Sequence, residues 1–196
     1  MTHVHSLDRL LDHISDRSVN TTEVGSAVED VADWALLMSG EYGSRIARIE
    51  RWEDWAERVN LSVRNDIGID RVVTTVTGAH WAVQVKGYDT KRRGNVKLLP
   101  GTRVGLDALG KLVAAAPLVP RCEHLIVVST GGGFTRHARN TNMGASHGVH
   151  IRDRAWMRGT AVGDQITPQF PSSLERLKVG LDSARAQLRR EHPAHY

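Results

Sequence analysis

The sequence contains almost no cysteine, since Cys122 is the only one among its 196 residues. A single thiol cannot form a disulfide within the chain, which excludes a fold that depends on internal disulfides. Such scarcity is typical of proteins in a reducing compartment, and it predicts a cytoplasmic location.

Long apolar runs are also absent. No stretch approaches the roughly 20 apolar residues that a helix needs to cross a bilayer. Residues 1–18 alternate charged residues with leucine and lack the apolar core of a signal peptide. The sequence therefore predicts neither a membrane protein nor a secreted one.

The composition is that of an ordinary globular domain. Hydrophobic residues make up 40% and charged residues 24% of the chain, which excludes a disordered protein. The net charge of +4 and a pI of about 9.6 are mildly basic and give a weak indication of a polyanionic partner.

Apolar residues recur at helical spacing in several segments. They predict helices over residues 6–16, 21–38 and 103–116, a shorter helix over 134–140, and a charged helix with a leucine stripe after Pro171. The Trp-rich segment 45–60 does not indicate one state, and its acidic residues, Glu50 among them, are expected to be solvated.

Two runs rich in β-branched residues, 69–76 and 81–88, flank a glycine-containing turn and predict a β-hairpin. Residues 124–130 form a continuous apolar run typical of a strand covered on both faces, and 148–153 predict a last strand. Residues 89–100 are expected to be a basic loop and Gly131–Gly133 a turn. This order predicts an α/β fold with a mixed sheet and helices on both faces.

Polar residues interrupt the predicted hairpin. Asp70 lies at the mouth of the first strand, and Gln84 and Lys86 stand between valines of the second. Because strand side chains alternate, Gln84 and Lys86 share one face, which Asp70 can approach from the partner strand. An amphipathic hairpin with Gln84 and Lys86 on its wet face explains this spacing equally well.

The same residues match the chemistry of an oxygen-ligated Mg²⁺ site. Such a site needs one or two carboxylates together with neutral oxygens and waters. Asp70, the Gln84 amide oxygen and the Val85 carbonyl can supply part of that shell. Lys86 beside the metal could orient a water or stabilise developing charge on a phosphate.

Three segments resemble the Mrr-like branch of the PD-(D/E)xK nuclease superfamily. "NDIGID" (65–70) followed by "WAVQVKGYD" (81–89) resembles its Asp…Gln-x-Lys motif, in which Gln commonly takes the second acidic position. "SAVEDVADWAL" (26–36) resembles the first helix, whose metal-binding Glu corresponds to Glu29, and "HLIVVSTGGGF" (124–134) resembles the later strand and turn. The similarity covers about residues 20–155 and is greatest to the N-terminal nuclease domain of helicase-like restriction proteins.

The resemblance implies a restriction-endonuclease-like α/β core and a metal-dependent endodeoxyribonuclease of a restriction system. Glu29, Asp70, Gln84 and the Val85 carbonyl are then expected to bind Mg²⁺, with Mn²⁺ as a substitute. Lys86 is expected to position or activate the water that hydrolyses a phosphodiester bond in double-stranded DNA. Gln84 makes the site less negative than an all-carboxylate site, which predicts weaker metal binding or one ion instead of two.

The sequence departs from the family pattern in two places. Arg71 stands where an apolar residue is usual, and it is expected to point away from the face of Asp70 and to affect packing more than chemistry. The basic loop after Tyr88 is longer than expected. Its cations are expected to contact DNA phosphates: Lys91, Arg92, Arg93 and Lys97.

The resemblance also implies a domain organisation. Residues 1–160 are expected to form the nuclease domain, and 161–196 a linker and C-terminal helix leading to a helicase or translocase domain in the same polypeptide. The alternative is a catalytically inactive DNA-binding or assembly module on the same fold, and the presence of all four motif residues argues against it. The sequence leaves the oligomeric state open.

Overall fold

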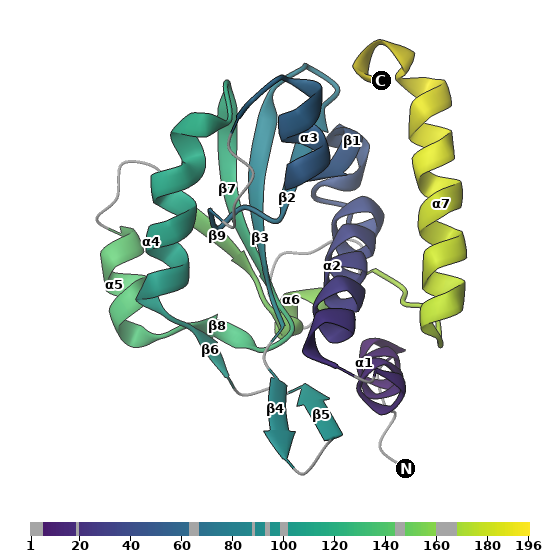
Figure 1. The fold of residues 1–196 in the computed structure, drawn as a ribbon, viewed down its shortest axis with the longest axis vertical. Helices are drawn as coiled ribbons and strands as arrows, with labels where there is room; N and C mark the ends of the chain where they lie inside the picture. Colours follow the sequence, from purple (N-terminus) through teal and green to yellow (C-terminus); the bar gives the residue numbers. More distant parts are fainter. Residues whose placement is uncertain are drawn as a thin grey trace.

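The computed structural model describes residues 6–18, 20–62, 67–87, 89–92, 95–98, 102–143, 148–159 and 168–196. A five-stranded sheet runs through the middle of the molecule, in the order β1-β2-β3-β7-β9 (Figure 1). Its strands are β1 (Ile46–Arg51), β2 (Arg71–Thr75), β3 (His80–Lys86), β7 (Cys122–Ser129) and β9 (Val149–Arg152). Strands β1, β2 and β3 pair antiparallel, and β7 and β9 continue the sheet parallel to β3, so the predicted mixed sheet is confirmed.

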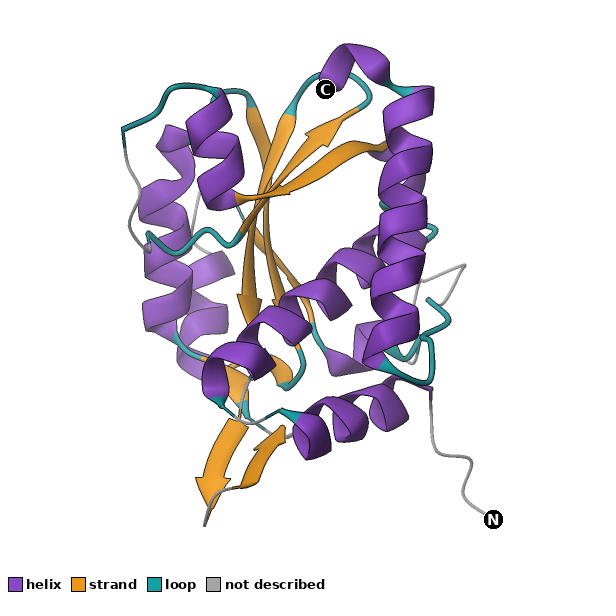
Figure 2. Ribbon diagram, turned by 45° about the vertical axis from the view of Figure 1, so that its right-hand side comes forward, coloured by secondary structure: helices purple, strands orange, loops and turns teal. Residues whose placement is uncertain are grey.

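Helices cover both faces of this sheet (Figures 1 and 2). One layer contains α1 (Ser6–Arg17), α2 (Thr21–Met38), α6 (Arg154–Met157) and α7 (Leu174–Glu191), and the other contains α3 (Trp52–Arg58), α4 (Leu106–Ala115) and α5 (Arg136–Met143). Val83 and Val85 of β3 belong to the core under α2, whereas Ala82 belongs to the core under α4. Strand alternation thus separates the two layers as the sequence predicts. None of the helices in the described ranges is long and apolar enough to cross a membrane.

Two segments differ from the predicted loop and turn. The expected basic loop contains a two-stranded antiparallel ribbon, β4 (Asp89–Arg92) with β5 (Asn95–Leu98). The expected glycine turn forms strand β8 (Gly132–Phe134), which pairs in parallel with β6 (Arg103–Val104). This pairing buries Val104 completely and delays the start of α4 to Leu106, three residues later than predicted.

The Trp-rich segment forms edge strand β1 and helix α3. Trp52 and Trp55 are fully buried and stack with their ring centroids 5.4 Å apart, which anchors α3 on the sheet. The prediction of a solvated Glu50 is wrong, because its side chain is 6% exposed and lies between Arg48 and Arg58. Arg48 comes from the same strand as Glu50, and Arg58 comes from the last turn of α3, so the turn from β1 into α3 brings these charges together.

The C-terminal helix α7 packs against α2 rather than extending from the body (Figures 1 and 2). Leu177 and Leu181 are buried in the core that α2 also lines. Gly180 allows the close approach, since a Cβ there would lie 2.6 Å from the Trp34 ring. The Ser173 hydroxyl accepts the Arg176 N–H and caps the helix N-terminus.

A partly buried charge cluster joins α1 to α6 and to Arg158, the residue after it. Asp8 accepts hydrogen bonds from Arg154 and Arg158, the shortest at 2.7 and 2.6 Å. Burial alone raises the pKa of Asp8, but the two guanidiniums outweigh it and hold the pKa below its usual value.

Asp8→Asn should therefore lower the free energy of unfolding at pH 7 by about 1–3 kcal/mol, because two cations lose a charged partner. A carboxyl whose pKa is depressed in the folded state stabilises above its unfolded pKa and loses that effect as the pH falls through the folded value. The difference between wild type and variant, measured by urea denaturation, should thus shrink below about pH 4. Asp12→Asn, at an exposed position of α1, is the control and should change little at either pH.

Candidate functional site

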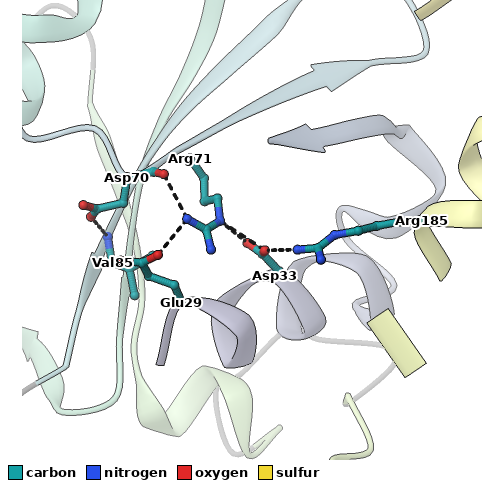
Figure 3. A network of polar contacts seen from close by, with 6 residues as sticks. All are labelled: Glu29, Asp33, Asp70, Arg71, Val85 and Arg185. Carbon is teal, nitrogen blue, oxygen red and sulfur yellow. Dashed lines mark hydrogen bonds and ion pairs between the residues drawn. The ribbon is translucent and has the colours of Figure 1, made fainter. Parts of the chain in front are cut away.

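The candidate site begins where β2 separates from β3. The Asp70 N–H donates to the Val83 carbonyl at 2.9 Å, next to the last Cα pair of the ladder, Arg71 with Val83. Beyond this point the Asp70 carboxylate replaces the missing strand, since its Oδ2 accepts the Val85 N–H at 2.6 Å (Figure 3). A carboxylate side chain therefore bridges the gap between β2 and β3 at the mouth of the hairpin.

The Val85 carbonyl faces the same gap. The N–H and C=O of one strand residue point to the same side, and the Val85 N–H points toward Asp70. The next residue points the other way, because the Lys86 carbonyl accepts the Thr130 N–H at 3.1 Å on the β7 side. The Asp70 carboxylate and the Val85 carbonyl thus face the same gap, and their assignment as metal ligands stays a prediction.

Gln84 lies on the α4 face of β3 and is 1% exposed. Its Oε1 is buried and has no hydrogen-bond partner among the described residues. Gly68 packs against the amide, since a Cβ there would lie 3.2 Å from Gln84 Nε2, and its φ of +89° also favours glycine. A buried acceptor without a donor is costly, and a bound cation or water is the usual remedy.

Lys86 ends β3 on the same face as Gln84 by strand alternation, and it is half-buried. It lies opposite Ser129 in the parallel register with β7. Lys86 therefore lies at the same end of β3 as Val85 and its partner Asp70.

Glu29 approaches from the other layer. It lies on α2 with its side chain 29% exposed, and its Oε2 accepts from Arg71 Nη1 at 2.8 Å. The same nitrogen donates to the Asp70 carbonyl at 3.1 Å. The structure therefore brings Glu29 beside Asp70 through a shared guanidinium (Figure 3). Glu29 lies in the α2 layer, on the sheet face opposite Gln84 and Lys86.

Arg71 belongs to a buried network that extends to the C-terminal helix. Its Nε donates to both carboxylate oxygens of Asp33 at 3.0 and 3.1 Å, and Arg185 of α7 donates to Asp33 Oδ2 at 2.7 Å. Burial disfavours the charged form of Arg71, but Asp33 and Glu29 outweigh it and raise its pKa. Arg71 therefore joins Glu29 and the Asp70 carbonyl to Asp33, and the expectation that it affects packing more than chemistry stays a prediction.

Sequence reasoning missed Asp33 and Arg185. Asp33 follows Glu29 by four residues on one helix, so the two carboxylates share a face, and this spacing is the only local signal. Nothing in the sequence pairs Arg185 with Asp33, because the contact joins segments far apart in the chain.

The predicted DNA-contacting residues lie beyond this end of β3. Strand β4 begins at Asp89, three positions after the last residue of β3, and the β4–β5 ribbon projects from the body there (Figure 1). Lys91 and Arg92 belong to β4 and Lys97 to β5, whereas Arg93 lies outside the described residues.

The oxygen ligands suit a hard cation such as Mg²⁺. No group of three or more His, Cys, Asp or Glu side chains in the described part of the chain is arranged to hold a metal ion. The candidate set contains only two such side chains, Glu29 and Asp70, and the rest of its oxygens come from an amide and a carbonyl. The unpartnered Gln84 oxygen is the observation that favours a cation here.

Comparison with known families decides the assignment. The model of an Mrr-type restriction endonuclease family matches residues 38–164. The chain belongs to this restriction endonuclease family. The matched segment includes Asp70, Arg71, Gln84 and Lys86, whereas Glu29 lies before it.

The chain is similar to parts of two solved restriction enzymes. The ATP-dependent Type ISP restriction-modification enzyme LlaBIII bound to DNA aligns with a TM-score of 0.51 and 18% identity over 80% of this chain, which spans 8% of that enzyme's chain. The DNA modification-dependent restriction endonuclease AspBHI gives a TM-score of 0.45 and 15% identity over 94% of this chain and 43% of its own. The LlaBIII alignment shows a restriction-endonuclease-like fold for this family member. No curated protein matches the chain.

Proposed function

We propose that this restriction endonuclease domain hydrolyses phosphodiester bonds of double-stranded DNA with Mg²⁺, and with Mn²⁺ as a substitute. The observation that carries the proposal is the geometry at the mouth of the hairpin. There the Asp70 carboxylate accepts the Val85 N–H beyond the end of the β2–β3 ladder, and the Val85 carbonyl faces the same gap. Glu29, Asp70, the Gln84 amide oxygen and the Val85 carbonyl are the proposed metal ligands. Because Glu29 approaches from the α2 face and Gln84 from the α4 face, an ion that they share has to lie in the gap between β2 and β3.

Each residue then has a chemical role. A bound Mg²⁺ supplies Lewis acidity and a lower pKa for the attacking water. Asp70 holds its position through the Val85 N–H and contributes negative charge to the ligand set. Lys86 orients the water and stabilises charge that develops on the phosphate as the new P–O bond forms and the ester P–O bond breaks.

The ribbon β4–β5 is the proposed DNA-contacting element. It leaves the body at the end of β3 that carries Lys86, so cations on it can reach phosphates near the cleaved bond (Figure 1). Lys91, Arg92, Arg93 and Lys97 are assigned to these contacts because phosphate contacts dominate the affinity for DNA.

We further infer that the nuclease works with a helicase or translocase domain in the same polypeptide. Its similarity to a small part of an ATP-dependent Type ISP enzyme supports this. The rival function is a DNA-binding or assembly module without catalysis, and the experiments below separate the two.

Asp70→Asn should lower the cleavage rate by about 100-fold or more, because the neutral amide loses the charge that a metal requires. An amide oxygen can still accept the Val85 N–H, so the variant should fold.

Lys86→Ala should lose cleavage similarly, with most DNA affinity retained. The measurement is nicking of a plasmid with Mg²⁺, Mn²⁺ or EDTA, and Lys178→Ala, at an exposed position of α7, should cleave like wild type.

Cleavage that survives EDTA, or wild-type rates in Asp70→Asn, would contradict the metal-dependent mechanism. DNA binding without cleavage under every metal condition would establish the inactive module instead.

Replacing Lys91 and Arg92 by alanine should weaken DNA binding and reduce the slope of log K against log salt by about 0.9 for each phosphate that the variant no longer neutralises. The measurement is fluorescence anisotropy of a labelled duplex with Ca²⁺ or EDTA, which keeps the DNA intact. The control variant replaces Arg189 and Arg190 of α7 by alanine. It removes the same amount of positive charge at positions outside the ribbon. An unchanged slope in the β4 variant would show that these residues do not contact phosphates.

A further inference from the structure

Arg71 places a positive charge between two residues that the proposed function assigns to the metal, and this inference rests on that function. Its Nη1 lies 2.8 Å from Glu29 Oε2 and 3.1 Å from the Asp70 carbonyl (Figure 3). A guanidinium keeps its charge at any ordinary pH, so the cation cannot be removed by deprotonation.

The cation is also fixed in place. The Arg71 side chain is 3% exposed, and its Nε donates to both oxygens of Asp33, which is 0% exposed. Arg185 holds Asp33 from the other side at 2.7 Å. Moving Arg71 would leave a fully buried carboxylate with one partner fewer, which is unfavourable.

Glu29 is the movable member of the network. Its side chain is 29% exposed, and its only described ion pair is the one with Arg71. A metal ion can therefore reach Glu29 from solvent while Arg71 stays with Asp33.

The charges near the site determine whether Arg71 strengthens or weakens metal binding. The three carboxylates of Glu29, Asp33 and Asp70 are balanced by three cations, Arg71, Arg185 and Lys86, so the surroundings of a site for a divalent ion carry no net negative charge. A bound metal ion and Arg71 would both pair with the Glu29 carboxylate, and two positive charges that share one carboxylate repel each other in a partly buried setting.

We propose that Arg71 is an internal competitor for the metal. Binding of the divalent ion requires Glu29 to exchange its Arg71 partner for the ion, so Arg71 weakens metal binding and raises the concentration of metal that the domain needs. Arg71 acts through Glu29 and is therefore a positioning residue.

The test measures Mn²⁺ binding to the full chain without DNA, from the electron paramagnetic resonance signal of the free ion. Arg71→Met should bind Mn²⁺ about tenfold more tightly than wild type, because Glu29 is released and a repelling charge is removed. The gain should be smaller in a Glu29→Gln background, where nothing is left to release. Arg189→Met removes a guanidinium from α7 outside this network and should leave the affinity unchanged.

A second variant guards against loss of the fold, since Arg71→Met leaves Asp33 with Arg185 alone. Asp33→Asn/Arg71→Met removes the buried carboxylate together with its partner, and it should also bind Mn²⁺ more tightly. Equal or weaker binding in the folded variants, with Mn²⁺ binding in wild type that Asp70→Asn abolishes, would overturn the competitor role and leave the proposed function intact. Absence of Mn²⁺ binding in wild type and in both Arg71 variants would overturn both.

Discussion

The hydrogen bond from the Val85 N–H to the Asp70 carboxylate governs the geometry of the whole site. It forms where β2 has left β3, so a strand that would otherwise lose its backbone partner is satisfied by a side chain. Because the acceptor is a carboxylate, the same contact that completes the sheet also fixes a negative charge next to the Val85 carbonyl. The Asp70 side chain therefore completes the hydrogen bonding of β3 and supplies the charge that the proposed chemistry needs.

The helical layers on both faces of the sheet pack against the residues around this gap between β2 and β3. On the α4 side, Gly68 packs closely against Lys111 and Gln84, and a Cβ there would lie 2.6 Å from Lys111 Cβ. Under α2, Glu29 reaches the same region only through Arg71, whose other contacts bury it against Asp33. Arg185 connects that network to α7, so the helix that ends the chain contributes to the electrostatics of the site.

Much of the fold follows from patterns that can be read in the sequence. Alternation in "WAVQVK" separates Val83 and Val85 from Gln84 and Lys86, and the core residues of the two layers lie as this alternation predicts. The β6–β8 pairing could not be predicted, because two-residue and three-residue strands have no periodicity to detect. The ribbon in the basic segment was missed because its charged residues are typical of loops.

The residues of the candidate site also divide into those that the sequence indicates and those whose contacts depend on tertiary packing. Asp70, Gln84 and Lys86 stand out because polar residues interrupt apolar strands, and Glu29 stands out only through the family pattern. Arg71 was visible as a departure from that pattern, but alternation gives only the face on which it lies. Its contacts with Glu29 and Asp33 depend on the packing of α2, which no local signal encodes.

The most direct test of the account is a crystal structure of the chain with Mn²⁺, in which anomalous scattering locates the ion. The account predicts an Mn²⁺ ion at the mouth of the hairpin, about 2.0–2.6 Å from an Asp70 carboxylate oxygen and from the Val85 carbonyl, with Glu29 turned from Arg71 toward the ion. An ion bound elsewhere, with Asp70 contacting only the Val85 N–H in a protein that cleaves DNA, would contradict it.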